Sequence, residues 1–540
     1  MPKLKLTDAP SIDYFETLGT PTSVLNHEGT DHGPADFTLD DYPGFTFRDK
    51  PILDLDGVID QIDSGYNQKV TGSNTITYTF LKEGQDLISI YNNPNYGFTA
   101  GEGLSAFRPD QVEYARTAID LWDDIVAPEF REVNGRGADI QFANSWDPAQ
   151  AYAYYPSEKY GYKYLGDVFI ADAASYFDDE GNLIFEGNYT NANLSFGGYG
   201  ATTIVHELGH AIGLSHPGDY NYDPDLPLSY TNYAEYAQDS EQYSIMSYWS
   251  GQETGQIAVN WGTFFFNNPQ TPLVHDILTA QAKYGADPDT RADDTVYGFN
   301  STADKDVYDF SLNDYPYLSI YDAGGEDTLD MSGFNSSVLI NLNQGQFSSG
   351  GQRDVTPEFQ AEAMQPLNDA IEFTYGWEDY YTPFDQGTID AVIDRYAFGG
   401  FRSDGSYQIG IEQYIEWDWG HSDVGANQYD NISIAYGTVI ENAVGGDFRD
   451  IIVANEVDNT LTGNGGDDVF IFQHGGNDTI TDFESGSDLI DLSWLGTEAG
   501  TDIVIGAGFM TADFDMDGNV DLTLTFDNGA TITTNDIYFG

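Results

Sequence analysis

A nine-residue spacing in the C-terminal part of the chain constrains the fold more than any other feature. The polar residues Asp450, Asn459 and Asp468 lie nine positions apart, and an apolar residue stands two positions after each of them. These apolar residues are Ile452, Leu461 and Phe470. A repeat this short buries its apolar residues only when successive copies stack, so it predicts short parallel strands wound into a β-roll.

Glycine and aspartate fill the turns of this repeat. The best copy is GNGGDDVFI at residues 463–471, and a weaker copy at residues 475–480 comes one residue late. Glycines let the backbone turn tightly and point its carbonyls at a cation, and the aspartates add charge. The turns therefore predict several bound calcium ions, with candidate ligands Asp450, Gly463, Gly465, Asp468 and Asp478.

The charge of the chain is strongly acidic. It has 19 Lys+Arg against 89 Asp+Glu, a formal net charge of -70. A compact chain tolerates this only when cations neutralise or screen the carboxylates, so nucleic acid and anionic membrane surfaces are poor partners. A salty habitat and calcium ligation both account for the excess, and we expect both to contribute.

The chain has no cysteine, which excludes disulfides, thiolate nucleophiles and cysteine-based metal sites. The N-terminus carries Lys3 and Lys5 but no apolar stretch of signal-peptide length. No run approaches the roughly 20 apolar residues of a membrane span, so we expect a soluble chain whose export uses another signal.

A length of 540 residues predicts at least two domains. Residues 1–50 are polar and aperiodic, which indicates a leader, and regular structure is expected to begin near Asn74. Apolar spacing then predicts strands near 77–81, 138–142, 151–155 and 167–171, and helices from Arg108 and from about Thr202. We therefore expect an α+β domain at 51–285 and a β-roll domain at 286–540.

Three histidines fall within the eleven residues HELGHAIGLSH, at 206–216. His206 and His210 are four apart and share one face of a helix, so they can bind one ion together. Gly213 can adopt the left-handed conformation that ends the helix, which brings in His216 as the third ligand. Three neutral imidazoles suit one zinc ion and leave a coordination position for water.

Glu207 follows the first ligand directly, so it can reach that water without binding the metal. The metal would acidify the water and polarise a scissile carbonyl, and Glu207 would take the proton and pass it to the leaving amine. A structural zinc site is the alternative. About thirty residues later, SIMSYW at 244–249 places Met246 where a methionine turn would lie beneath the metal; a core filler is the other interpretation.

With these motifs the chain resembles the serralysin-type metalloproteases of the metzincin clan, which are secreted zinc endopeptidases with a C-terminal RTX calcium-binding β-roll. The resemblance runs from about Pro51 to Ser493 with one interruption. It rests on HELGHAIGLSHPGDY at 206–220, residues 244–249, DTVYGFNS at 294–301, DAGGEDTLD at 322–330, residues 439–446 and residues 490–493.

The resemblance implies a metzincin catalytic domain followed by a parallel β-roll or β-sandwich calcium domain. A peptide substrate would pair with an edge strand, here Ala151, Tyr152, Ala153 and Tyr154. Tyr248 holds the position of a movable zinc ligand that helps to stabilise the oxyanion. The family's calcium positions correspond to Arg291, Asp293, Thr295, Asp322, Gly324 and Asp327, and to Gly325, Val439 and Glu441; Asp293 stands where the family has glycine.

The sequence also departs from the family pattern. Phe448 and Asn459 occupy positions that are usually Gly and Asp, so fewer ions should bind to the roll. The leader is long for the family. Residues 350–422 form an insertion in which Thr356-Pro357 opens a helix and aromatic residues cluster among acids, either as a packed subdomain or as a substrate-binding element. These aromatic residues are Trp377, Tyr380, Tyr381, Trp417 and Trp419.

The C-terminus bears on export. The family uses a type I secretion machinery that reads an uncleaved C-terminal signal. DIYFG at 536–540 resembles that signal, with Gly540 out of pattern, and a final strand is the alternative. Asp513, Asp515, Asp517 and Gly518 resemble the start of an EF-hand loop, but Leu524 replaces the required Glu, which favours a tight turn.

Taken together, the sequence predicts a secreted, monomeric endopeptidase that acts on proteins or peptides. The alternative is a non-catalytic, calcium-dependent surface or adhesion protein with a vestigial zinc site. The intact Glu207, Met246 and Tyr248 argue against it.

Overall fold

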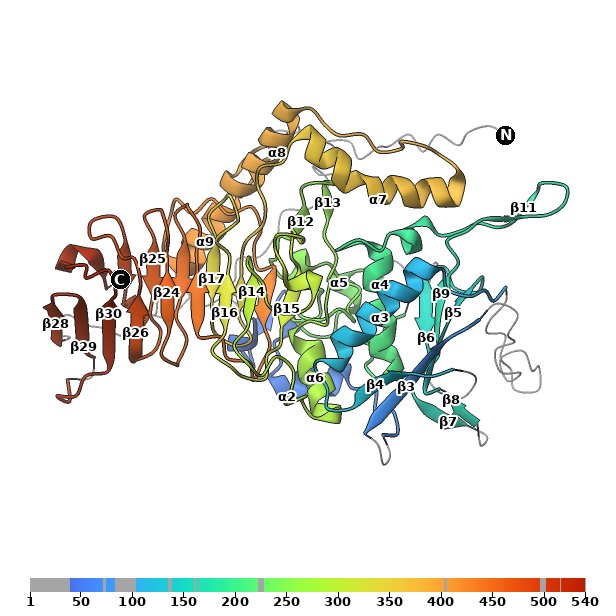
Figure 1. Cartoon of the computed structure of the whole chain (residues 1–540), viewed down its shortest axis with the longest axis horizontal. Helices are drawn as coiled ribbons and strands as arrows, with labels where there is room; N and C mark the ends of the chain where they lie inside the picture. Colours follow the sequence, from blue (N-terminus) through green and yellow to red (C-terminus); the bar gives the residue numbers. More distant parts are fainter. Residues whose placement is uncertain are drawn as a thin grey trace.

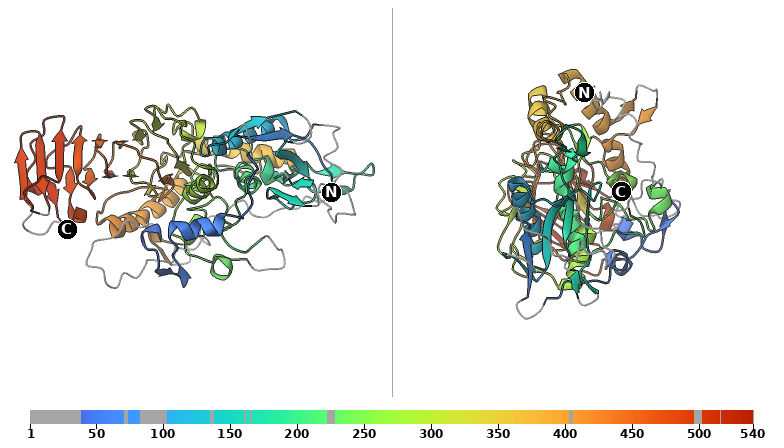
Figure 2. Two further views of the ribbon diagram at one scale, coloured as in Figure 1. Left: turned by 90° about the horizontal axis from the view of Figure 1, so that it is seen from below. Right: turned by 90° about the vertical axis from the view of Figure 1, so that its right-hand side faces the viewer.

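The computed structural model describes residues 39–70, 74–82, 103–134, 138–159, 162–164, 166–221, 228–402, 406–495, 502–514 and 516–539. The chain forms an elongated molecule, with a mixed helical and strand half at one end and a stack of short strands at the other (Figure 1). The same division is visible from below (Figure 2).

The first half is built on a five-stranded sheet in the order β4-β3-β5-β9-β6. Its strands are β3 (Thr75–Phe80), β4 (Glu129–Glu132), β5 (Ile140–Ser145), β6 (Ala151–Ala153) and β9 (Val168–Ala171). All neighbours are parallel except β6, which pairs antiparallel with β9 and forms one edge. The strands expected from apolar alternation are therefore confirmed.

Helices α3 (Pro109–Asp123) and α4 (Tyr199–Ala211) pack together, and their apolar faces join one core with the sheet. Trp122 of α3 is fully buried, and its indole N–H donates to the carbonyl of Val205 in α4 at 3.0 Å. Both predicted helices are present, and α3 ends at Asp123. The remaining elements of this half are α2 (Leu55–Ile62), β7 (Ser157–Lys159), β8 (Tyr162–Tyr164), β10 (Tyr176–Phe177), β11 (Leu183–Phe185), η2 (Tyr189–Ala192), α5 (Tyr230–Tyr233), β12 (Val259–Asn260), β13 (Phe265–Phe266) and α6 (Val274–Tyr284).

The prediction that structure begins near Asn74 is wrong. Elements start at η1 (Leu39–Asp41), followed by β1 (Thr46–Phe47), β2 (Lys50–Pro51) and α2. Leu39 and Phe47 are buried, and the Asp40 carboxylate lies 2.9 Å from the ring of the buried His275. Contacts with distant residues fix this segment, and such contacts leave no periodic pattern in the sequence. Residues 1–38 of the expected leader lie outside the described part of the chain.

The second half contains two sheets of mostly parallel strands. One has the order β14-β16-β22-β24-β26-β30-β29-β28 and the other β17-β23-β25-β27-β31. The first comprises β14 (Val296–Gly298), β16 (Thr328–Asp330), β22 (Asn442–Val444), β24 (Thr460–Thr462), β26 (Gly476–Ile480), β28 (Asp502–Gly506), β29 (Phe509–Asp513) and β30 (Leu522–Phe526). The second comprises β17 (Leu339–Asn341), β23 (Ile451–Val453), β25 (Val469–Ile471), β27 (Leu489–Asp491) and β31 (Ile537–Tyr538).

The predicted nine-residue period is confirmed in these sheets. Strands β22, β23, β24 and β25 begin at residues 442, 451, 460 and 469 and alternate between the two sheets. Ile452, Leu461 and Phe470 are all fully buried between them. The chain therefore winds so that each nine-residue copy adds one strand and one core side chain.

The expected insertion is a helical excursion between β18 (Phe347–Ser348) and β21 (Ile432–Ile434), which form a small sheet with β15 (Leu318–Ile320). It contains α7 (Pro357–Tyr375), α8 (Gln386–Phe398), β19 (Gly400–Phe401), β20 (Tyr407–Gln408) and α9 (Ile411–Trp419). Thr356 caps α7 as predicted, because its hydroxyl accepts from the N–H of Phe359 at 3.1 Å. Figure 1 shows α7 extending over the half of the molecule that carries α4.

The aromatic residues of the insertion do not form one cluster, which corrects the prediction. Trp377, Tyr380 and Tyr381 follow α7, whereas Trp419 of α9 packs against Trp494, with ring centroids 5.6 Å apart. The helices that separate the two groups hold them on different parts of the molecule.

The motifs near the C-terminus form strands and a hairpin turn. Asp513 accepts from the N–H of Gly518 at 2.9 Å in the turn between the antiparallel strands β29 and β30, while Leu524 is fully buried in β30. Asp515 and Gly540 lie outside the described residues. Among the described residues, no helix is long and apolar enough to cross a membrane.

Candidate metal centre

Helix α4 and the turn after it position the three histidines. His206 and His210 lie on adjacent turns of α4, and Gly213 leaves the helix with φ +100°. A Cβ on Gly213 would lie 1.9 Å from the carbonyl oxygen of Tyr66, so both the backbone angle and the close approach require glycine. The reversal brings His216 back to the other two rings, as predicted.

Main-chain carbonyls fix the orientation of all three imidazoles. The Nδ1 atoms of His206, His210 and His216 lie 2.7, 2.8 and 2.9 Å from the carbonyl oxygens of Ile245, Leu214 and Tyr220. A carbonyl only accepts hydrogen bonds, so each Nδ1 carries the proton. Each Nε2 therefore presents a lone pair.

The three Nε2 lone pairs point at one another. The Nε2 atom of His216 lies 3.3 Å from that of His206 and 3.0 Å from that of His210. No proton remains to join these atoms, so their approach is unfavourable unless a cation binds between them. Burial lowers the pKa of His206 to about 4 and that of His216 to about 3, which maintains the neutral, ligating form. The residues present therefore fit a zinc ion.

Glu207 is the one carboxylate next to this centre in α4. It is buried, and its Oε2 atom has no hydrogen-bond partner among the described residues. Burial raises the pKa of Glu207 to about 8. A carboxylate with a free oxygen and a raised pKa is suited to accept and return a proton beside the metal position.

Met246 lies directly beneath α4. It is fully buried, and a Cβ on Gly209 would lie 2.4 Å from its sulfur. The preceding carbonyl, of Ile245, is the one that orients His206. The turn therefore supports the zinc helix and one ligand at the same time.

We expect Gly209→Ala to destabilise the protein by about 1–3 kcal/mol, because the added methyl group must displace Met246 from a packed core. Thermal melting measures the loss. Gly387→Ala is the matched control, since Gly387 also lies in a helix, α8, but its Cβ would lie 3.4 Å from Asp385 Oδ1, which is an ordinary contact distance. Equal melting temperatures for wild type and Gly209→Ala would contradict the assigned packing.

Sequence reasoning missed two buried acids that hold the site. Asp276 of α6 accepts from the Ser244 hydroxyl and from the N–H of Ile245, both at 2.7 Å, and so fixes the methionine turn. Asp239 accepts from Tyr220 at 2.8 Å and from the Trp249 indole at 3.1 Å. Neither acid belongs to a motif or a periodic pattern in the sequence, so no local signal marks it.

Tyr248 lies at the centre, as predicted. Its ring centroid is 4.3 Å from that of His216, and its side chain is 38 % exposed. A half-exposed tyrosine beside buried ligands can reach a bound substrate.

Strand β6 runs alongside α4. At its start, Gln150 donates to the Thr203 hydroxyl at 3.0 Å; beyond its end, the rings of Tyr155 and His210 are 5.6 Å apart. Among the described residues, β6 is the last strand of its sheet and pairs with β9 alone, which suits its outer side to main-chain pairing with a peptide. The predicted residues Ala151, Tyr152 and Ala153 form β6 and Tyr154 follows it. A polar cavity of about 280 Å³ adjoins His216 and Tyr155 on this side.

The calcium positions expected near residue 300 are partly brought together. Asp327 accepts from the N–H of Thr295 at 2.7 Å, and its own N–H donates to Glu441 at 2.7 Å. The Asp293 carbonyl faces Gly325, within 2.9 Å of where a Cβ would be. Asp327 Oδ2 is buried and makes no hydrogen bond within the described residues. Asp322 accepts from the N–H of Gly324 at 2.7 Å.

Arg291 and Val439, two of the expected calcium positions, have no side-chain oxygen to offer a calcium ion. The Arg291 side chain binds Asp124 of the first half at 2.6 Å, so only its backbone is available to a cation. Val439 is 39 % exposed. In the described part of the chain, the three histidines are the only group in which three or more His, Asp or Glu ligand atoms lie within 4.8 Å of one another. A calcium ion would therefore depend on main-chain carbonyls.

The repeat aspartates are bound to the backbone of neighbouring turns. Asp468 accepts from the N–H of Asp450 at 2.9 Å, and Asp450 accepts from that of Val338 at 2.8 Å. The Asp468 carboxylate crowds Gly463, whose Cβ would lie 2.3 Å from it, whereas Gly465 has more space. Asp478 lies in β26 of the other sheet, where its carboxylate accepts from the N–H of Asn459 at 2.8 Å.

Side-chain donors occupy several turn carbonyls. Asn459 donates to the carbonyl of Glu441 at 3.0 Å, Asn464 to that of Gly445 at 2.8 Å, and Arg449 to that of Asp467 at 3.0 Å. A cation would compete for these oxygens. That fewer ions bind to the degraded repeats stays a prediction.

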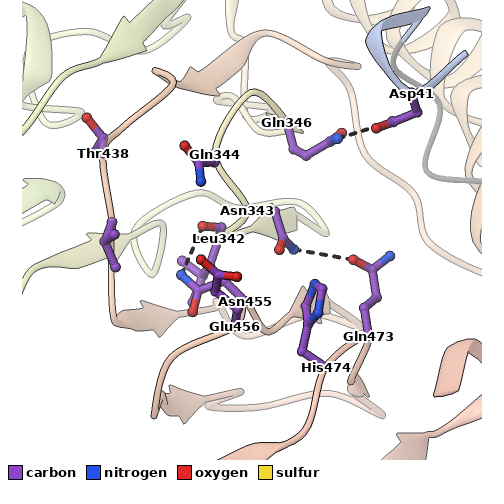
Figure 3. A pocket seen from close by; sticks show the side chains of 11 residues that line it. Asp41, Leu342, Asn343, Gln344, Gln346, Thr438, Asn455, Glu456, Gln473 and His474 are labelled. Carbon is purple, nitrogen blue, oxygen red and sulfur yellow. Dashed lines mark hydrogen bonds between the residues drawn. The ribbon is translucent and has the colours of Figure 1, made fainter. Parts of the chain in front are cut away.

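A second cavity of about 280 Å³ lies at the ends of β17, β23 and β25 (Figure 3). Its amides bind one another and the N-terminal segment: Gln346 donates to Asp41 at 3.2 Å, and Asn343 to Gln473 at 3.4 Å. These contacts join the segment at Asp41 to the strand stack, so we assign this cavity a structural role.

Fold and site thus define a candidate metalloprotein with a three-histidine centre on an α+β unit, joined to a stack of parallel strands. Residues 286–355 and 381–540 match the family model Peptidase M10 serralysin C terminal. Residues 356–380, which are α7 and the turn after it, are left unmatched within the expected insertion.

Curated relatives agree with this match. The chain is 40% identical to Serralysin from Proteus mirabilis over 260 residues, which are 45% of this chain and 49% of the relative. It is 34% identical to Metalloprotease AprA from Pseudomonas entomophila over 328 residues, 59% of each chain. Serralysin B from Dickeya chrysanthemi is 35% identical over 324 residues, 57% of this chain and 60% of the relative. The chain is similar to serralysin-type metalloproteases, and it spans about half to three fifths of the length of these relatives.

Proposed function

We propose that this protein is a secreted zinc endopeptidase that hydrolyses peptide bonds of proteins. The observation that carries the proposal is the convergence of three neutral Nε2 atoms, with Glu207 next to the first of these histidines and its Oε2 without a hydrogen bond to any described residue. The similarity to relatives named serralysin and metalloprotease supports it.

A zinc ion held by His206, His210 and His216 would polarise the scissile carbonyl and make an attacking water more acidic. Glu207 accepts the proton of that water at its free carboxylate oxygen and returns it to the leaving amine. Strand β6 aligns the substrate by main-chain pairing along its open edge. Tyr248 donates to the oxyanion as the carbonyl becomes tetrahedral.

The proposal also assigns a role to each of the two domains. The first half is a metzincin-type catalytic domain, within residues 51–285, and residues 286–540 form a calcium-binding β-roll domain. Calcium near Asp327 and in the turns at Asp450 and Asp468 stabilises the fold. The chain acts as a monomer and leaves the cell through a type I secretion machinery. Asp536, at the start of its C-terminal signal, is only 3% exposed in the folded chain.

Casein hydrolysis tests this function. The zinc-loaded protein should degrade casein, a zinc chelator should abolish the activity, and added zinc should restore it. Zinc binding without hydrolysis would favour the alternative, a calcium-dependent adhesion protein with a vestigial metal site.

We expect Tyr248→Phe to lower kcat by about 10²- to 10³-fold with little change in KM, because an oxyanion donor acts mainly in the transition state. Steady-state kinetics on one peptide measures both constants. Tyr233→Phe, on the short helix α5, serves as a control for hydroxyl loss. Equal changes in kcat and KM would instead assign Tyr248 to substrate binding.

A further inference from the structure

The segment that the family model leaves unmatched, residues 356–380, is anchored on the first half of the molecule. The Thr374 hydroxyl of α7 donates to the buried carbonyl of Ala173 at 2.8 Å, and the Arg108 guanidinium lies 5.0 Å from the Phe373 ring. Helix α7 also contacts η2. The far end of α7 is therefore fixed beside the catalytic half rather than projecting into solvent (Figure 1).

Four aromatic side chains form a row at this end, which we call the aromatic row: Tyr189, Tyr375, Trp377 and Tyr380. Successive ring centroids are 6.0, 4.8 and 5.8 Å apart, and the last two pairs are stacked. All four side chains are partly exposed. Rigid, half-exposed aromatic side chains offer contact area to a polypeptide at small cost in conformational entropy.

The row begins next to the start of β6. Tyr189 lies in η2, where the flanking Asn188 donates to Gln150 at 2.6 Å and Asn191 donates to the Gln150 carbonyl at 3.0 Å. Gln150 immediately precedes β6. The aromatic row therefore extends away from the Gln150 end of the open edge of β6.

The direction of β6 decides which end of a substrate points to the row. Gln150, just before β6, contacts Thr203, and Tyr155, two residues after β6, packs against His210, so the three histidines lie toward the later part of the strand. A peptide that pairs antiparallel with β6 runs from the Tyr155 end to the Gln150 end. Residues on the C-terminal side of the scissile bond then leave the cleft at Gln150.

We propose that the aromatic row binds the substrate segment that follows the scissile bond, several residues beyond the metal centre. This inference rests on the proposed peptidase function. The row is a binding extension of the open edge of β6, so it increases the affinity for long polypeptides and is not needed for the chemistry.

The surroundings of the row select for basic residues in that segment. Glu372, Glu378 and Asp379 are exposed next to it. Lysine and arginine are attracted by these carboxylates and by the faces of tryptophan and tyrosine. The occupant is therefore an extended, basic segment of a substrate protein.

The test compares two quenched fluorescent peptides on the full-length protein. They share their sequence up to the second residue after the scissile bond, and the longer one continues for ten residues that include lysine and arginine, a reach of about 33 Å. We expect the extension to raise kcat/KM about tenfold in wild type, mainly through KM, and the double variant Tyr375→Ala/Trp377→Ala to remove this gain. Cleavage of the short peptide should not change.

Trp417→Ala is the matched control, because Trp417 is a 43% exposed tryptophan on α9 of the same excursion. It should keep the full gain. A third peptide, extended only before the scissile bond, should be cleaved equally by wild type and the double variant.

The outcomes separate the two proposals. If wild type cleaves the short peptide but gains nothing from the extension, or if the double variant keeps the gain, the aromatic row does not bind substrate while the peptidase function stands. Equal losses on the short and long peptides would likewise contradict a binding role after the scissile bond. Absence of all cleavage by the zinc-loaded wild type would overturn both.

Discussion

Replacing Glu207 with alanine is expected to lower kcat by about 10²- to 10⁴-fold while the protein keeps its zinc and its fold. The three ligand Nε2 atoms and the carbonyls that orient them do not involve the Glu207 side chain. The variant therefore loses the proton carrier and nothing else at the site. Peptide hydrolysis and zinc content, measured on the same sample, check this separation.

His210→Ala provides the complementary result. It removes one of three ligands, so we expect loss of zinc together with loss of activity. The control for Glu207→Ala is Glu113→Gln, which removes one carboxylate from an exposed position on α3. Near wild-type turnover in Glu207→Ala would show that another group carries the proton, and retained zinc in His210→Ala would place the metal elsewhere.

Removing calcium is expected to loosen the second half of the molecule, roughly residues 290–493, before the zinc-bearing half. Burial raises the pKa of Asp327 and of Asp468 to about 7, which shows that an ionised carboxylate is unfavourable at both positions without a cation. A cation that binds only the folded state stabilises it by mass action. We expect a shift of about 10 °C or more in the melting of this half, because several ions act together.

Hydrogen exchange followed by mass spectrometry locates the loosening, and thermal melts are recorded in chelator, in calcium and in sodium chloride alone. Salt screens the net charge of -70 but cannot supply coordination. We therefore expect salt to restore only part of the melting shift. Full restoration of the melting shift by salt would mean that the acidic residues form a halophilic surface. The prediction of a calcium-dependent roll would then be wrong. If calcium folds the chain, low cytoplasmic calcium keeps it unfolded for export.

The sequence determined the features that depend on residues close together along the chain. The spacing of His206 and His210 follows from the helical period, and the reversal that brings in His216 needs the positive φ of Gly213. The nine-residue period predicted the strands of the stack from equally local information, since each copy contributes one turn and one buried side chain. Local geometry and burial are sufficient in each case.

Only the tertiary structure decided the features that join distant segments. Asp276 supports the methionine turn 31 residues away, Asp40 meets His275 across 235 positions, and Thr374 anchors α7 on Ala173 across 201. None of these residues stands in a periodic pattern, because a single buried hydrogen bond requires one side chain rather than a repeated one. The sequence therefore predicted the group of three histidines and the repeat. The supports of the site, the docking of residues 39–51 and the placement of the aromatic row depend on contacts that form only when the whole chain packs.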